Sequence, residues 1–281
     1  MREHIEVNRS EATVRRARPL ATWSSGDLPP TTVRQMARKA IVCRAAWPFL
    51  SALAWCALRL VGKYRIQNLA DIRRRYAEIA AVPGPLLICS NHLTFIDSIL
   101  ILWALGSPSW HWRHFTRSSW NVPAADVFGR SRFWRAIFAM TKCVMIDRTG
   151  SLRHRDDVLR VCSHLLLMGE TVTIFPEGRR SRSGHFDLER LKPGLGKVVA
   201  ATGPCRVLCI YLRGDRQPAF SDFPPRGSTF KLGMDIIDLD QEVSDLPYRA
   251  ITRIVGQRIA HLEESYLTEH ASMEANANAS G

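Results

Sequence analysis

Residues 86–97 read LLICSNHLTFID, an apolar run that ends in a cluster of polar side chains. The run Leu86–Ser90 predicts a short buried strand, and the residues from Asp97 to Ala104 predict a helix. The same alternation continues along the chain, with strands expected at 144–146, 171–175, 206–212 and 229–237, and helices at 133–140, 152–168, 194–201 and from 247 to about 269. This alternation predicts an α/β domain built on a mostly parallel sheet flanked by helices.

Two polar residues that could take part in catalysis follow the first predicted strand, and ligands bind at such strand ends in α/β folds. His92 comes just after the strand, and Asp97 stands where the next helix begins. A strand–turn–helix junction folds the chain back far enough for the Asp97 carboxylate to meet an imidazole nitrogen, which would make His92 a general base. The same residues also allow a simpler interpretation, in which Asp97 caps the helix and His92 packs, because the spacing H-x-x-x-x-D often arises by chance.

A second polar cluster, FPEGRRSRSG at residues 175–184, follows another predicted strand. It contains Glu177, Gly178 and three arginines. Guanidinium groups in a glycine-containing loop predict a phosphate-binding site, and the alternative is a basic loop that is only solvated. Between the two clusters, Asp147 and Arg148 form a charged pair at the end of a further predicted strand.

The chain is strongly basic, since 39 Lys and Arg against 26 Asp and Glu give a formal charge of +13 over 281 residues. Such an excess favours an anionic partner, which could be nucleic acid, anionic lipid or an acidic carrier protein. The cations are spread over the N-terminal part and the strand-end loops rather than gathered in one stripe interleaved with aromatic residues. This distribution argues against nucleic acid as the partner.

Several classes of protein do not fit the motifs. Seven scattered cysteines without a C-x-x-C pair fit neither a disulfide framework nor a zinc ribbon, and they predict a reducing compartment. The sequence contains no G-x-S-x-G, which argues against a serine hydrolase or thioesterase. No H-E-x-x-H or cysteine cluster is present, so we expect no metal site.

The N-terminal part differs in composition from the rest. Residues 1–31 predict a disordered basic arm, and residues 32–62 predict a helical segment with an uncharged stretch at 45–58. That stretch is too short to span a bilayer of about 30 Å, and Pro48 is expected to kink it. Tryptophans with flanking cations favour a helix in the membrane interface, and the alternative is a buried core helix. Residues 63–269 then form the main domain, and 270–281 a disordered tail.

Taken in order, the motifs between about Leu86 and Leu212 resemble those of the glycerolipid acyltransferase family, the type that acylates 1-acyl-glycerol-3-phosphate. His92 and Asp97 match its H-x-x-x-x-D motif, Asp147-Arg148 its second block, and residues 175–181 its block FPEGTRS. The segment Lys192-Pro-Gly resembles the basic segment that follows. Two departures are Arg179, which replaces the usual Thr, and Cys209, which stands where the family carries a proline; both bear on the acceptor pocket.

The resemblance implies a glycerol-3-phosphate acyltransferase-like fold and a role in phospholipid biosynthesis. It implies that His92, oriented by Asp97, takes the proton from an acceptor hydroxyl as this attacks an acyl thioester. The acceptor is expected to be 1-acyl-glycerol-3-phosphate, which gives phosphatidic acid; another lyso-lipid, a specialised hydroxylated lipid, or a non-catalytic lipid-binding role are the alternatives. Residues expected to bind the acceptor are Arg148, Glu177, Gly178, Arg179, Arg180, Ser181 and Lys192.

The resemblance also sets expectations about partners and location. Acyl-CoA or acyl-carrier protein would be the co-substrate, with no metal and no other cofactor. The partners are expected to be a lysophospholipid, the acyl donor and an anionic membrane surface, without nucleic acid. We therefore expect a monotopic or peripheral membrane-associated enzyme on the cytoplasmic face.

Overall fold

A computed structural model describes residues 28–129, 131–217 and 220–279 of the chain. Within these residues, six strands form one sheet in the order β1-β6-β5-β2-β4-β3. The pairs β1–β6, β5–β2, β2–β4 and β4–β3 are parallel, and only β5–β6 is antiparallel. The sheet is therefore mixed, with a parallel majority, and its strands span Arg65–Ile66 (β1), Leu86–Ser90 (β2), Trp120–Asn121 (β3), Thr171–Ile174 (β4), Cys205–Gly214 (β5) and Thr229–Leu239 (β6).

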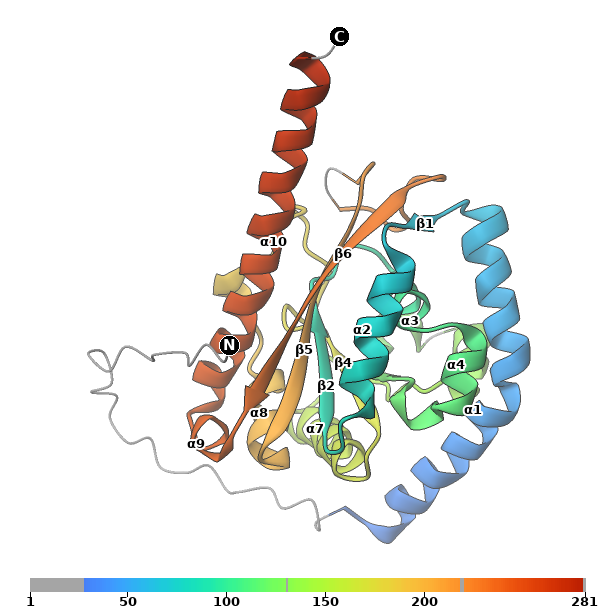
Figure 1. Cartoon of the computed structure of the whole chain (residues 1–281). Coiled ribbons are helices and arrows are strands. Elements are labelled where there is room, and N and C mark those ends of the chain that lie inside the picture. The colour runs from blue at the N-terminus through green and yellow to red at the C-terminus, as the bar shows by residue number, and fades with distance from the viewer. Residues whose placement is uncertain (1–27, 130, 218–219, 280–281) are drawn as a thin grey trace.

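Helices cover both faces of this sheet (Figure 1). One face packs on α7 (Leu152–Leu167), α8 (Gly194–Thr202) and α10 (Tyr248–Ala279), and the other on α2 (Leu69–Ala81) and α3 (Asp97–Leu105). Alternate residues of each central strand point to opposite faces. In β2, Leu87 and Cys89 join the first core, whereas Leu86 and Ile88 join the second. A three-layer α/β domain results.

Shorter helices complete the described fold. They are α4 (Pro108–Arg113), α5 (Ala125–Phe128), α6 (Arg132–Ala139) and α9 (Gln241–Ser244), together with single turns at Phe115–Arg117 and Leu188–Arg190. Serine caps begin two of the helices that the sequence predicts: Ser131 accepts a hydrogen bond from the N–H of Trp134, and Ser151 from that of His154. Such side chains satisfy backbone donors that the first helical turn leaves free.

The helix α1 (Pro30–Cys56) lies along one side of the molecule and continues as a π-helical turn, Ala57–Val61 (Figure 1). Pro48 lies inside α1 and does not end it. Of the described residues, this segment is the one helix long and apolar enough to cross a membrane by length and composition, and 11% of its most apolar window is buried. Its 32 residues would extend about 48 Å. The prediction that it is too short counted only the uncharged stretch at 45–58.

The exposure of α1 decides between the two sequence interpretations of this segment. Cys43 and Leu58 are buried, whereas Ile41, Phe49, Leu53 and others are exposed. A core helix would bury such side chains. The alternative of a buried core helix is therefore wrong, and the exposed apolar surface is consistent with association with a membrane.

Two sequence expectations differ from the structure. The segment 144–146 forms single bridges, from Cys143 to Asn121 and from Ile146 to Ala124, instead of a strand. Pro123 lies between these partners and has no N–H to continue a ladder. At the other end, α10 runs to Ala279, through most of the expected disordered tail at 270–281, because Ala, Glu and Met there are strong helix formers.

Other elements were not predicted, or lie outside the described residues. No pattern in the sequence predicted α2, β1 or β3, and these two strands are only two residues long. The expected basic arm at 1–31 falls mostly outside the described residues, which begin at 28. The helix α1 starts at Pro30, close to the expected boundary.

Candidate active site

The two predicted polar loops meet at the carboxyl ends of β2 and β4. These strands are parallel neighbours, so the loops that follow them leave the sheet at the same edge. The Ser181 N–H donates to the carbonyl of His92 over 2.7 Å, and the His92 N–H donates to Glu177 Oε2 over 3.2 Å. Residues 85 or more positions apart in the chain thus form one site.

The Asp97 carboxyl group contacts the imidazole of His92, as the sequence predicts. Nδ1 of His92 lies 2.9 Å from Oδ2 of Asp97. The same oxygen accepts hydrogen bonds from the N–H groups of Leu93 (2.6 Å) and Thr94 (2.8 Å), and the Thr94 hydroxyl donates to Oδ1. Asp97 therefore orders the turn before α3 and holds the histidine at the same time.

These contacts fix how the imidazole can act. Nδ1 faces a carboxylate and so carries the proton, which leaves Nε2 with a lone pair. Among the described residues, Nε2 has no hydrogen-bond partner. The ring stacks on Phe175 at a centroid distance of 4.2 Å and an angle of 21°. The His92 side chain is 21% exposed against 7% for Asp97, so the imidazole lies nearer the surface than the carboxyl group that contacts it.

Glu177 is buried under the loop rather than directed to solvent. Its residue is 3% exposed, and burial raises the pKa of its carboxyl group to about 8, while the hydrogen bond from the backbone of His92 works in the opposite direction. At neutral pH the side chain is therefore mostly protonated. Its contact with the His92 backbone gives it a part in holding the loop.

Gly178 and Lys192 form the turn next to Glu177. Gly178 has a φ of +65°, in the left-handed region that favours glycine. A Cβ atom there would lie 2.9 Å from Cγ of Lys192, whose own N–H donates to the carbonyl of Pro176. The side chain of Lys192 is exposed, as is that of Arg179.

The two arginines expected to bind phosphate are each paired with an aspartate. Arg148 donates from Nε and Nη2 to both oxygens of Asp126, over 3.1 and 2.7 Å, and from Nη1 to the carbonyl of Gly178. Arg180 donates from Nη1 to Asp222 Oδ1 over 2.6 Å. Its guanidinium carbon lies 3.5 Å from the centre of the Phe95 ring, in the loop between His92 and Asp97.

The structure thus gathers most of the predicted site residues into one loop cluster. Direct contacts join His92 to Asp97, Glu177 and Ser181, and Arg148 to Gly178. Ser181 is buried, and its hydroxyl donates to the carbonyl of His185 instead of facing solvent. Arg179 and Lys192 lie on the exposed rim of the same loops.

Sequence reasoning missed the acidic partners Asp126 and Asp222. Neither residue belongs to a motif. Asp126 is 22 positions from Arg148 and Asp222 is 42 positions from Arg180, and only the folded chain brings each pair into contact. Asp126 opens the short helix α5, and Asp222 precedes β6. No spacing rule in the sequence places these carboxylates beside the two arginines.

Cys209, one of the two departures from the family pattern, lies away from the site. It is fully buried in β5, belongs to the core beneath α10, and has its Sγ 4.0 Å from the carbonyl of Val255. Burial raises the pKa of its thiol to about 12, so it remains a neutral packing residue. Of the two departures, only Arg179 stands among the site loops.

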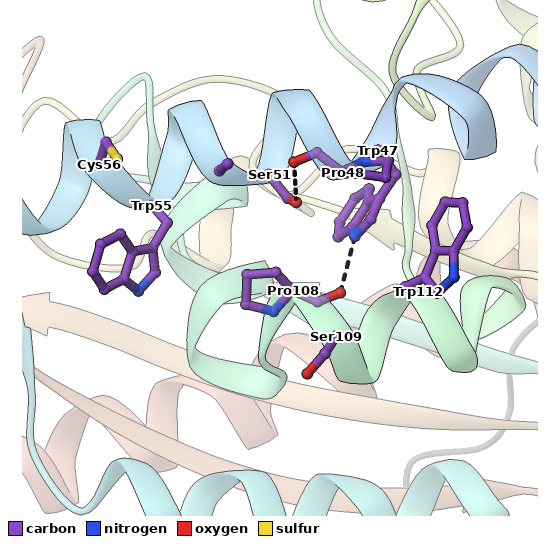
Figure 2. A pocket seen from close by; sticks show the side chains of 9 residues that line it. Trp47, Pro48, Ser51, Trp55, Cys56, Pro108, Ser109 and Trp112 are labelled. Atoms are coloured by element: carbon purple, nitrogen blue, oxygen red, sulfur yellow. Dashed lines mark hydrogen bonds between the residues drawn. The ribbon is translucent and has the colours of Figure 1, made fainter.

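An apolar groove lies elsewhere, between α1 and α4 (Figure 2). It has a volume of about 520 Å³, and Trp47, Trp55 and Trp112 line much of it. Nε1 of Trp47 donates to the carbonyl of Pro108 over 3.0 Å and ties the two helices together. None of the predicted site residues lines this groove.

Within the described ranges, no group of three or more His, Cys, Asp or Glu side chains could hold a metal ion. Comparison with known families adds one finding: a family model described as Acyltransferase matches residues 63–213, more than half of the chain and all the predicted site residues. Its members are enzymes that transfer acyl groups from a donor to lipid substrates. The chain belongs to this family and is a glycerolipid acyltransferase.

Proposed function

We propose that the protein transfers an acyl group from an acyl thioester to the free hydroxyl of a lysophospholipid, with His92 as the general base. The observation that carries this proposal is the 2.9 Å contact between His92 Nδ1 and Asp97 Oδ2, at the carboxyl edge of the sheet. It supports a histidine whose Nε2 accepts a proton while its other nitrogen stays fixed.

In the proposed reaction, His92 and Asp97 are the groups that handle the proton. The acceptor hydroxyl gives its proton to Nε2 of His92 as its oxygen attacks the thioester carbonyl. Asp97 stabilises the imidazolium that forms. The tetrahedral intermediate collapses with cleavage of the carbon–sulfur bond, and the leaving sulfur takes the proton back from His92. The products are the esterified lipid and a free thiol.

Arginines are suited to hold the acceptor, because a guanidinium fork matches the geometry of a phosphate. Arg148 and Arg180 carry this part of the proposal, and Arg179 and Lys192 add positive charge nearby. Glu177, Gly178 and Ser181 shape the loop. With this set, the acceptor that we propose is 1-acyl-glycerol-3-phosphate, which becomes phosphatidic acid. A different lyso-lipid is the second candidate, favoured by the exposed Arg179 in the position where the family has a threonine.

The donor that we propose is acyl-CoA or acyl-carrier protein, since both are anionic thioesters that suit a chain of charge +13. The location that we propose for this reaction is an anionic membrane surface on the cytoplasmic side. Support comes from the exposed apolar helix α1 and from the free state of all described cysteines, which suits a reducing compartment.

The test is an acyl-transfer assay with purified protein, a panel of lysophospholipids and both donor types, read by mass spectrometry. His92→Ala should lower the rate by about 10²- to 10⁴-fold, the usual contribution of a positioned acid–base group. Asp97→Asn should also lower it strongly. His261→Ala is the matched control, because this histidine is exposed on α10. Unchanged transfer by the His92 variant would rule out the mechanism, and absence of transfer to any acceptor would favour a non-catalytic lipid-binding role.

A further inference from the structure

An aromatic cluster extends from the catalytic loop to the surface of the molecule. Phe95, between His92 and Asp97, lies 5.6 Å from Phe128 at the end of α5, measured between ring centroids. Phe128 in turn lies 5.4 Å from Trp134 on α6. We name this cluster the aromatic rim, and its members are Phe95, Phe128, Phe133, Trp134, Phe138 and Phe223.

The outer part of the aromatic rim is exposed. Phe133 is 65% exposed, Phe223 62% and Trp134 40%. No residue of α6 is buried. Scattered apolar side chains are ordinary on a protein surface, but large aromatic residues in contact with one another mark an interaction site.

The charges around the exposed rings indicate what covers them. Arg132 and Arg135 are exposed on the same helix as Phe133 and Trp134. Aromatic rings beside cations on a short amphipathic helix are suited to the interface of an anionic bilayer, where the rings enter the acyl-chain boundary and the cations meet the head groups. Binding to a protein partner would not explain why cations lie beside the exposed rings.

Two contacts fix the aromatic rim beside both the active site and α1. Asp126 of α5 is held by Arg148, which also binds the carbonyl of Gly178 in the site loop. Nζ of Lys39 on α1 donates to the carbonyl of Cys143, in the segment that follows α6. The helix α5, which carries Phe128, is therefore anchored to the site loop, and the segment just after α6 contacts α1.

We infer that the aromatic rim is a second membrane contact, which docks on the surface of an anionic bilayer and brings the active site to its lipid substrate. This inference rests on the proposed function in one respect, the lipid nature of the acceptor. It goes beyond that function by placing the membrane at α6 and at the mouth of the site, in addition to α1.

The first experiment locates the bilayer without using activity. Cys56 is the exposed cysteine among the seven, and the other six are buried, so a Cys56→Ser background allows single-site labelling. An environment-sensitive fluorophore is attached to the full-length Phe133→Cys variant and, as control, to Met168→Cys. Met168 is 67% exposed, close to the value for Phe133, but it lies just before β4, at the opposite edge of the sheet.

With phosphatidylcholine vesicles that contain phosphatidylglycerol, the probe at 133 should shift to the blue and be quenched by brominated acyl chains. The probe at 168 should show neither effect. Arg132→Gln with Arg135→Gln should weaken the response at 133 on anionic vesicles. Equal responses at 133 and 168, or none at either position, would overturn the inference, and the second outcome would leave a protein partner as the occupant.

The second experiment measures the consequence for catalysis. Phe133→Ser with Trp134→Ser should lower the ratio of transfer to a vesicle-borne acceptor over transfer to a short-chain monomeric acceptor by at least tenfold, which corresponds to about 1.4 kcal/mol of lost membrane binding. An unchanged ratio would overturn the inference. If the protein transfers no acyl group at all, the proposed function fails, and the fluorescence experiment still decides on the membrane contact.

Discussion

Arg180 donates a hydrogen bond to Asp222 and so joins the loop after β4 to the segment before β6, over 2.6 Å. The side chain of Asp222 is 62% exposed, whereas that of Arg180 is only 17% exposed. The arginine packs against the rings of Phe95 and Phe220, and Asp222 is its exposed ion-pair partner. If Arg180 binds the acceptor phosphate as proposed, the phosphate competes with Asp222 for this guanidinium.

This competition predicts opposite effects for the two partners. Asp222→Asn should lower the KM for a phosphate-bearing acceptor by about two- to fivefold, the range expected when an exposed ion pair is removed. Arg180→Ala should raise that KM by about tenfold or more, with a smaller effect on kcat, since a phosphate held throughout the reaction contributes uniform binding. Steady-state kinetics with varied acceptor measures both values.

The control for this experiment is Asp71→Asn, which removes an equally exposed partner of Arg74 on α2, away from the site. It should leave KM unchanged. A kcat effect of Arg180→Ala without a change in KM would contradict a binding role for this arginine.

Glu177 gives a prediction about pH. Its unfolded pKa lies near 4.5, and burial raises its folded pKa to about 8. Between these values the folded state holds a proton that the unfolded state has lost. The stability contributed by the protonated group is therefore complete below pH 4.5 and is lost as pH rises through 8, by about 1.4 kcal/mol per pH unit in between.

Glu177→Gln should remove this loss between pH 4.5 and 8 and keep an oxygen to accept the His92 N–H. Denaturant unfolding at several pH values across this range, for the wild type and the variant, measures the difference. Glu264→Gln is the control, since this carboxylate is 81% exposed. An identical pH profile for wild type and Glu177→Gln would show that the buried carboxyl group does not titrate in this range.

His111 predicts the reverse dependence at acid pH. It lies in α4, 2% exposed, with Nε2 2.8 Å from the carbonyl of Leu102 and Nδ1 2.9 Å from the Ser118 hydroxyl. Burial lowers its pKa from 6.5 to about 4. Below pH 6.5 the unfolded state binds a proton that the folded state does not bind. The free energy of unfolding therefore falls as pH drops towards 4, by about 3 kcal/mol in total.

Glu177 acts in the opposite direction over part of this range, so the test of His111→Gln is the difference in stability between wild type and variant. The variant costs stability at neutral pH, and this difference should shrink as pH falls below 6.5. The neighbouring His114→Gln is the matched control, because His114 is exposed. Urea unfolding between pH 7 and pH 5 provides the measurement, and a difference that stays constant over this range would assign the acid loss to other groups.

The parts of this structure that the sequence predicts are those governed by local pattern. Apolar runs locate β2, β4, β5 and β6 within a residue or two, because a buried strand is continuous in sequence. The contact between His92 and Asp97 was predictable because the two residues are five positions apart, at one junction between a strand and a helix. The catalytic role of this pair stays a prediction.

The parts that the sequence misses depend on distant partners or on weak local signals. Asp126 and Asp222 are ordinary acidic residues until the fold places them against Arg148 and Arg180. The run at 144–146 has the composition of a strand. The segment beside it contains Pro123, which has no N–H to donate to a strand ladder. The bounds of the N-terminal helix were predicted closely, but the length available to cross a membrane was underestimated, since that prediction counted only the uncharged stretch at 45–58.

A last prediction concerns the support beneath the site, where α8 crosses α10. A Cβ atom on Gly196 would lie 1.8 Å from the carbonyl oxygen of Tyr248, so the two helices approach more closely than any side chain allows. Gly196→Ala should therefore destabilise the protein by about 1–3 kcal/mol, the usual cost of overpacking a core, or more if α10 cannot shift. Gly194→Ala, two residues earlier in the same helix, is the control, because its Cβ atom would meet only Leu159 at 3.4 Å. Alanine is also the better helix former, so this variant should be neutral or slightly stabilised. Thermal unfolding in detergent compares the two, and equal midpoints would contradict the close contact between α8 and α10.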